Sequence, residues 1–217
     1  MKAFIFDLDG TLLDTLEDIG RACNAVLAAH GHSVHPLAAY RRMVGNGFGR
    51  LVRSALPPAA LCDLAPGALD ALVDEARLWY GQHMRERTRP YDGMPEALAE
   101  LARRGLTLAV LSNKPDDLTR ALVNHYFPQI PFADVCGGRP GTPLKPHPAA
   151  PRSMLVRLGL KAGQCFYVGD SDVDMLTARN ADMISVGVTW GFRGLEEVRA
   201  AGARHLVTTP AQLPELI

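Results

Sequence analysis

The sequence has no excess of charge of either sign, because its 23 lysines and arginines are balanced by 23 aspartates and glutamates. It has no basic stripe and no acidic tail, so nothing in it favours nucleic acid or a membrane surface as a partner. No apolar run approaches the roughly 20 residues that a membrane-spanning helix needs. We therefore expect no nucleic-acid partner and no membrane partner.

Cysteine is scarce, and no two cysteines form a CxxC pair. The four cysteines, each isolated, are Cys23, Cys62, Cys136 and Cys165. Such spacing is typical of reduced thiols in a cytoplasmic protein, with two structural disulfides as the alternative. The first residues are one lysine, a short apolar run and then acids, which is not the pattern of a signal peptide. The expected location is therefore the cytoplasm.

Hydrophobic residues make up 47% of the chain, which is enough for a sizeable core. Several short runs are almost entirely apolar, as in strands buried on both faces of a parallel sheet. These runs are Lys2–Asp7, Leu106–Asn113, Gln164–Asp170, Met183–Val188 and His205–Thr209. Helical patterns lie between them at residues 92–105, 114–127 and 171–182. This alternation predicts a Rossmann-like, doubly wound parallel sheet of the α/β class.

One stretch, from Thr15 to Arg87, interrupts the alternation because it contains no convincing strand. Its first part, TLEDIGRACNAVLAAHG, repeats apolar residues at helical spacing, and three further segments also have helical patterns. We therefore predict an all-helical cap domain over residues 15–87, inserted into a catalytic core made of residues 1–14 and 88–217.

Polar and charged side chains follow three of the predicted strands directly. Asp7 and Asp9 end the first strand, Ser112 and Asn113 end the second, and Asp170 ends the third, with Asp174 close behind it and Lys145 in an intervening loop. Ligand sites of open α/β sheets form at the carboxyl ends of the strands. We therefore expect these groups to gather at one edge of the sheet.

Several carboxylates at one point repel each other unless a hard cation is bound, and Mg²⁺ takes carboxylate and carbonyl oxygens together with substrate phosphate. A carboxylate can also attack phosphorus to form an aspartyl-phosphate. A second carboxyl two residues away can protonate the leaving oxygen and later activate water. A serine hydroxyl, backbone amides and a lysine can hold the phosphoryl oxygens. The residue types therefore favour phosphoryl transfer.

These residues resemble those of the haloacid dehalogenase superfamily, whose four motifs occur in order as DLDGT, Ser112, Lys145 and GDSDVD. Within that superfamily, the stretches LSNKP, KPHP and VGNGFGRLV look like phosphoglycolate phosphatases. The resemblance extends over nearly the full length. It implies a Mg²⁺-dependent hydrolase that cleaves a small phosphorylated metabolite, 2-phosphoglycolate above all, through an aspartyl-phosphate. It is compatible with a monomer or a homodimer.

The resemblance also implies roles for the charged residues. Asp7 would be the nucleophile and a ligand of Mg²⁺. Asp9 would be the general acid and base, with its backbone carbonyl on the metal. Asp170 would bind the metal directly, and Asp174 would lie behind it or bind it occasionally. Lys145 would bridge the phosphate and the nucleophile.

Further roles concern the substrate. Ser112 and Asn113 would hold the phosphoryl group, and Thr11 would help to position the general acid. Gly47 lies in the glycine-rich stretch from Gly45 to Gly49, which is either a loop that faces the active site and selects the substrate or a simple connection between helices.

The sequence departs from the family in the loop stretches GGRPGTP and KPHPAAPRSML and in having Asp182 where many relatives have glycine. Arg50 and Arg53 are candidate partners of a substrate carboxylate, or ordinary surface charges.

Three other functions stay open. One is a phosphatase of another sugar phosphate or a nucleotide. The second is a phosphosugar mutase similar to β-phosphoglucomutase, in which Gly169-Asp170 would typically read Glu-Asp. The third is a non-catalytic phosphate-binding module, which would be expected to lose Asp7 or Asp9, and both are present.

Overall fold

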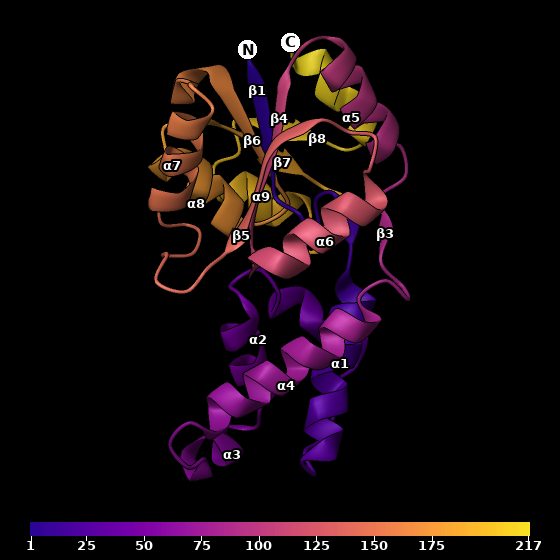
Figure 1. Ribbon diagram of the computed structural model, residues 1–217, viewed down its shortest axis with the longest axis vertical. Helices are drawn as coiled ribbons and strands as arrows, with labels where there is room; N and C mark the ends of the chain where they lie inside the picture. The colour runs from indigo at the N-terminus through magenta and orange to yellow at the C-terminus, as the bar shows by residue number, and fades with distance from the viewer. The chain divides into compact units, whose positions relative to one another are not determined.

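The computed structural model describes residues 1–217 and divides into two compact units (Figure 1). The first, called the sheet unit below, comprises Met1–Asp14 and Arg89–Ile217. The second, called the helical unit, comprises Thr15–Thr88. No helix combines the length and apolar character that crossing a membrane requires. All four cysteines are unpaired.

The sheet unit is built on six parallel strands in the order β5-β4-β1-β6-β7-β8. Their bounds are β1 (Ala3–Phe6), β4 (Thr107–Pro115), β5 (Phe132–Gly138), β6 (Cys165–Gly169), β7 (Ile184–Val188) and β8 (His205–Val207). Strand β1 lies at the centre, with Phe4 opposite Leu108 on one side and Phe166 on the other. All four residues of β1 are buried, as expected of a strand covered on both faces. The predicted α/β class with a doubly wound parallel sheet is confirmed.

Helices cover both faces of the sheet (Figure 1). They are α5 (Met94–Arg103), α6 (Asp116–Tyr126), α7 (Ala149–Arg157), α8 (Asp172–Asn180), α9 (Leu195–Ala200) and the 3-10 helices Ala162–Gln164 and Pro210–Leu216. Because side chains alternate along a strand, Ile5 points to a core shared with Met154 of α7 and Ala178 of α8. Phe4 and Phe6 stack with each other instead, and Phe4 also contacts the Phe166 ring.

Three strands have no counterpart among the predicted ones. Strand β5 is an edge strand in which Gly137 allows close packing, because a Cβ there would lie 2.5 Å from the Cα of Asp116. Its two glycines and half-exposed side chains hide the usual apolar run. The other two, β2 (Leu13–Asp14) and β3 (Arg89–Pro90), pair antiparallel where the chain leaves and re-enters the sheet unit.

The helical unit contains α1 (Leu16–Ala29), the 3-10 helix Leu37–Arg42, α2 (Phe48–Ala55), α3 (Pro58–Asp63) and α4 (Ala68–His83). Helices α1 and α4 pack together, and α2 packs on both. Buried Tyr40 donates a hydrogen bond to Asn24 and lies close against Gly20, where a Cβ would meet the tyrosine ring at 2.8 Å.

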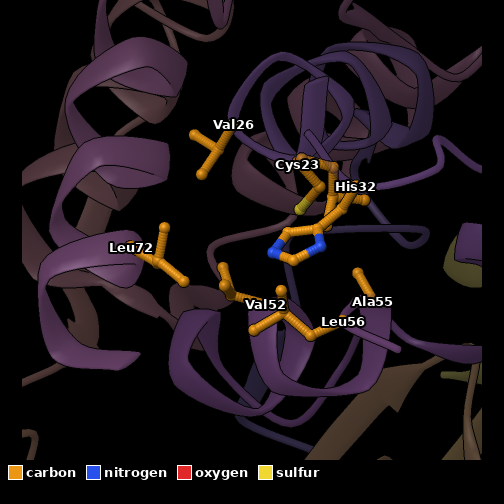
Figure 2. A pocket seen from close by; sticks show the side chains of 8 residues that line it. Cys23, Val26, His32, Val52, Ala55, Leu56 and Leu72 are labelled. Carbon is orange, nitrogen blue, oxygen red and sulfur yellow. The ribbon is translucent and has the colours of Figure 1, made fainter. Parts of the chain in front are cut away.

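A small apolar cavity lies between α1, α2 and α4 (Figure 2). Its lining is formed by Cys23, Val26, Leu27, His32, Val52, Ala55, Leu56 and Leu72. The His32 ring and the Cys23 thiol lie among the aliphatic side chains in Figure 2. Burial raises the pKa of Cys23 to about 12, so its thiol remains protonated and packs as an apolar group.

Candidate active site

The segment after β1 forms a tight turn that presents Asp7 and Asp9. The Asp7 amide still belongs to the sheet and donates to the Val168 carbonyl at 2.9 Å. The chain then folds back, and Leu12 and Leu13 both donate to the Leu8 carbonyl. Gly10 adopts a φ of 84°, and a Cβ there would lie 2.5 Å from Oδ2 of Asp170. Glycine is therefore required at this turn both for its backbone conformation and for the space beside Asp170.

Three buried carboxylates meet beside this turn. Ligand oxygens of Asp7, Asp170 and Asp174 lie within 4.8 Å of one another. Burial is the main cause that raises the pKa of Asp7 to about 7 and the pKa of Asp170 well above its usual range. The charge of Asp174 raises both pKa values further, Asp9 adds to that of Asp7 and Asp7 adds to that of Asp170, while Lys145 lowers both. Such an all-oxygen set short of positive charge fits a hard divalent cation such as Mg²⁺.

Lys145 supplies the positive charge next to these carboxylates. Its Nζ lies 2.9 Å from Oδ1 of Asp7 and 2.8 Å from Oδ1 of Asp174, and it lies 5.6 Å from the centre of the Tyr167 ring. Burial opposes the charge, but the two carboxylates hold the pKa of Lys145 well above its usual value. The lysine is therefore a permanent cation beside Asp7.

The backbone of Lys145 is fixed by the Asn113 side chain. Oδ1 of Asn113 accepts from the Lys145 amide at 2.7 Å, and Nδ2 donates to the Lys145 carbonyl at 3.0 Å. The Lys145–Pro146 peptide is cis. The proline-rich loop thus holds Lys145 through two hydrogen bonds to the end of β4. The Asn113 side chain therefore makes two hydrogen bonds to the Lys145 backbone. Its expected binding of the phosphoryl group stays a prediction.

Asp174 links Lys145 to the start of α8. Its Oδ2 accepts from the Ser171 amide at 3.2 Å and from the Ser171 hydroxyl at 2.6 Å, which caps the helix. Gly169 makes room for it, because a Cβ at Gly169 would lie 2.2 Å from the Asp174 Cβ. Asp172, in the same first turn of α8, is exposed, and its Oδ1 accepts from the neighbouring Val173 amide at 2.8 Å.

Two further predicted substrate residues are buried in the sheet unit. Ser112 is buried at the end of β4, and its hydroxyl accepts from the Lys114 amide at 3.2 Å. Thr11 is fully buried, its Oγ1 has no hydrogen-bond partner, and its carbonyl accepts from Trp190 Nε1 at 3.1 Å. Both residues thus lie in the sheet unit, Thr11 at the turn after β1 and Ser112 near the end of β4.

Two features of the site were absent from the predicted set. The first is Lys114, whose Nζ lies 2.9 Å from Oδ1 of Asp9. The second is the segment after β7, in which the Phe192 amide donates to Oδ2 of Asp170 at 2.6 Å and Gly191 lies directly against Asp170. Lys114 lies at the carboxyl end of β4, and the second segment follows β7, so the rule that found Asp7 and Asp170 indicates where these features lie but not which contacts they make.

Gly47, Arg50 and Arg53 belong to the helical unit. Gly47 is the N-cap of α2 with a φ of 85°, a conformation that by itself favours glycine. Both arginines are exposed on α2. Their predicted contacts with substrate stay predictions.

Comparison with known proteins agrees with this geometry. Residues 4–188 match the family described as haloacid dehalogenase-like hydrolase. The chain is 34% identical over 215 residues to the phosphoglycolate phosphatase of Xanthomonas campestris pv. campestris, which covers 99% of this chain and 95% of that protein. It is 37% identical over 205 residues to the phosphoglycolate phosphatase of Rhodospirillum rubrum, which covers 93% of this chain and 85% of that protein.

A solved structure also matches the chain over its full length. The structure of a predicted phosphoglycolate phosphatase from Haemophilus somnus 129PT matches with a TM-score of 0.90 and 26% identity, over 100% of this chain and 97% of that one. The similarity therefore extends over both units. The chain belongs to the haloacid dehalogenase-like hydrolase family.

Proposed function

We propose that the protein is a Mg²⁺-dependent phosphatase that hydrolyses 2-phosphoglycolate through an aspartyl-phosphate on Asp7. The similarity to phosphoglycolate phosphatases over nearly the full length supports the substrate. The observation that carries the chemistry is the position of Lys145, a buried cation 2.9 Å from the Asp7 carboxylate. The ammonium can hold a phosphoryl oxygen beside Asp7 while the carboxylate attacks phosphorus.

In the first step an oxygen of Asp7 bonds to phosphorus, and the bond from phosphorus to the ester oxygen breaks. Asp9 donates a proton to that oxygen, and glycolate leaves. Ser112 and Lys145 hold the phosphoryl oxygens on which charge is spread in the transition state. Mg²⁺, held by Asp7, Asp170 and the Asp9 carbonyl with Asp174 behind them, would neutralise phosphate charge.

In the second step water attacks the phosphorus of the aspartyl-phosphate. Asp9 now accepts a proton from the water, and the bond between phosphorus and the Asp7 oxygen breaks. Inorganic phosphate is released, and Asp7 returns to its carboxylate form. Both steps use the same residues, so one site suffices for the whole reaction.

The helical unit is proposed to be the cap of this enzyme, with the loop at Gly47 facing the substrate and excluding water during the first step. The protein is further proposed to act in the cytoplasm, which the four unpaired thiols support.

The phosphosugar mutase is disfavoured by a specific contact. Mutases of this superfamily would place glutamate at position 169, but a Cβ at Gly169 would lie only 2.2 Å from the Cβ of Asp174. A side chain there would displace Asp174 and with it the ion pair to Lys145.

The test is phosphate release from a panel of phosphate monoesters that includes 2-phosphoglycolate, sugar phosphates and nucleotides. Turnover of 2-phosphoglycolate with the highest kcat/KM is expected in Mg²⁺, with no turnover in excess EDTA. Asp7→Asn keeps the shape of the side chain but is a poor nucleophile, so it should abolish turnover of every ester. Full activity of Asp7→Asn would contradict the covalent mechanism, and preference for another ester would contradict the substrate.

A further inference from the structure

Lys114 is a buried cation that the proposed mechanism does not use. Its side chain is only 2% exposed, and its Nζ lies 2.9 Å from Oδ1 of Asp9, whose side chain is 10% exposed. The nucleophile Asp7 already has Lys145 as its cation. Burying a second ammonium costs free energy that only charged or polar partners can offset. The presence of Lys114 at the general acid therefore calls for a function.

The backbone of Lys114 is firmly placed at the end of β4. Its amide donates to the Ser112 hydroxyl at 3.2 Å, and its carbonyl accepts from the Thr119 hydroxyl at 3.1 Å. Gly137 of β5 approaches so closely that a Cβ there would lie 2.6 Å from this carbonyl. The Lys114 side chain therefore extends from a part of β4 whose backbone is held by hydrogen bonds and close packing.

The chemistry of the proposed substrate brings a second anion to the same place. The ester oxygen that leaves must come within roughly 3 Å of the Asp9 carboxyl to receive its proton. In a phosphorylated 2-hydroxy acid, one carbon separates that oxygen from the carboxylate, so the carboxylate oxygens lie only about 3 Å further on. This distance falls within reach of an ammonium that already contacts Asp9.

We propose that Lys114 binds the carboxylate of the substrate and thereby selects phosphorylated 2-hydroxy acids such as 2-phosphoglycolate. A lysine ammonium has three donors, so it can bond to Asp9 and to the substrate carboxylate together. It then fixes the leaving oxygen next to the general acid. This inference rests on the proposed phosphatase function and adds the residue that recognises the substrate. It assigns that role to the sheet unit rather than to Arg50 or Arg53.

The test compares 2-phosphoglycolate with ethyl phosphate, which has the same ester but lacks the carboxylate. Lys114→Met keeps most of the apolar stem and removes the charge, and Lys114→Arg keeps the charge. A hydrogen bond between charged groups contributes about 1.5–3 kcal/mol. Lys114→Met should therefore lower kcat/KM for 2-phosphoglycolate about 10- to 100-fold more than for ethyl phosphate, and Lys114→Arg should restore part of the difference.

Lys161→Met is the matched control, because Lys161 is exposed on the same unit. This variant should leave kcat/KM unchanged for both substrates. Binding gives a readout without turnover: in an Asp7→Asn background, calorimetry should show weaker binding of 2-phosphoglycolate after Lys114→Met, with ethyl phosphate unaffected. Thermal unfolding of each variant checks that the fold is kept, and if Lys114→Met does not fold, the comparison is made with Lys114→Arg and Lys114→Gln.

Equal losses for both esters would overturn the inference and leave Lys114 as a residue that only positions Asp9. The inference would also be overturned if Arg50→Met or Arg53→Met lowered kcat/KM selectively for 2-phosphoglycolate while Lys114→Met did not. The residue that recognises the carboxylate would then lie in the helical unit. Failure of the proposed function looks different, because the wild-type protein itself would then not prefer 2-phosphoglycolate to ethyl phosphate.

Discussion

Asp174 and Lys145 form a buried ion pair in which the carboxylate Oδ1 lies 2.8 Å from the ammonium Nζ. The second oxygen of Asp174 is bonded to Ser171 at the start of α8. The Asp174 carboxylate therefore contacts both the Lys145 ammonium and the first turn of α8. Its removal should affect the position of Lys145 as well as the end of the helix.

Asp174→Ala should lower the free energy of unfolding by about 1–3 kcal/mol, because Lys145 and the Ser171 amide and hydroxyl lose an acceptor while Asp7 remains beside the lysine. Asp172→Ala is the matched control. Asp172 lies in the same first turn but is exposed, so its loss should cost less than about 1 kcal/mol. Urea unfolding in EDTA measures both. Similar losses in the two variants would show that Asp174 acts only as a first-turn acid.

Gly191→Ala should weaken Mg²⁺ binding although it replaces none of the proposed metal ligands. A Cβ at Gly191 would lie 2.3 Å from the Asp170 Cβ and 2.3 Å from the Gly10 carbonyl, so the backbone must move. The next amide, that of Phe192, would then lose its bond to Asp170. Disturbing such a contact behind a metal ligand typically costs 10- to 100-fold in affinity.

The control for this change is Gly163→Ala, since nothing lies within 4 Å of a Cβ at that position. The Mg²⁺ concentration that gives half-maximal activity is the measurement. An unchanged value in Gly191→Ala would mean that the segment after β7 does not set the position of Asp170.

The sequence predicts the centre of the sheet well because burial leaves a plain signal there. Strand β1 has four buried residues and is followed by Asp7, and β6 has five and is followed by Asp170. A polar residue after such a run is conspicuous. Where both faces of a strand are covered, hydrophobicity alone therefore indicates the strand and the residues that follow it.

Other features leave weaker signals. The edge strand β5 ends in two glycines, of which Gly137 packs against Asp116 and Gly138 against Leu144 and the Asn113 carbonyl. A pattern of apolar residues does not reveal such a strand. The Phe192 group that donates to Asp170 is its backbone amide. Every residue except proline has such an amide, so the residue type at position 192 does not reveal this contact. The pairing of Lys114 with Asp9 depends on the path of a long side chain in three dimensions.

Asp18→Ala should destabilise the helical unit. The buried Asp18 carboxylate accepts from the Arg87 and Thr88 amides and from the Thr88 hydroxyl, which joins the start of this unit to its end. Alanine would remove the acceptor of these three donors, at a cost of about 2–4 kcal/mol. Glu17→Ala is the control, because Glu17 is exposed and its ion pair with Arg87 spans 3.5 Å. Equal unfolding free energies of the two variants would reject this role for Asp18.

The pH dependence of Mg²⁺ binding follows from the buried carboxylates. Burial, and then the charges of Asp174 and Asp9 against that of Lys145, raise the pKa of Asp7 from 3.8 to about 7 in the metal-free protein. The folded state therefore binds a proton between about pH 4 and pH 7 that the unfolded state has released. The resulting stability is fully present below the lower value and is lost as pH rises through about 7.

Mg²⁺ must displace this proton, so its apparent affinity should fall by up to about tenfold for each unit that pH drops below 7. Binding to the folded state alone raises the melting temperature. The increase in melting temperature at a fixed, non-saturating Mg²⁺ concentration should accordingly be large at pH 8 and small at pH 5.5. Asp7→Asn, which has no proton to lose at this position, should show a weaker pH dependence than the wild type. A Mg²⁺ effect that is the same at both pH values in the wild-type protein would mean that Asp7 is already ionised before the metal binds.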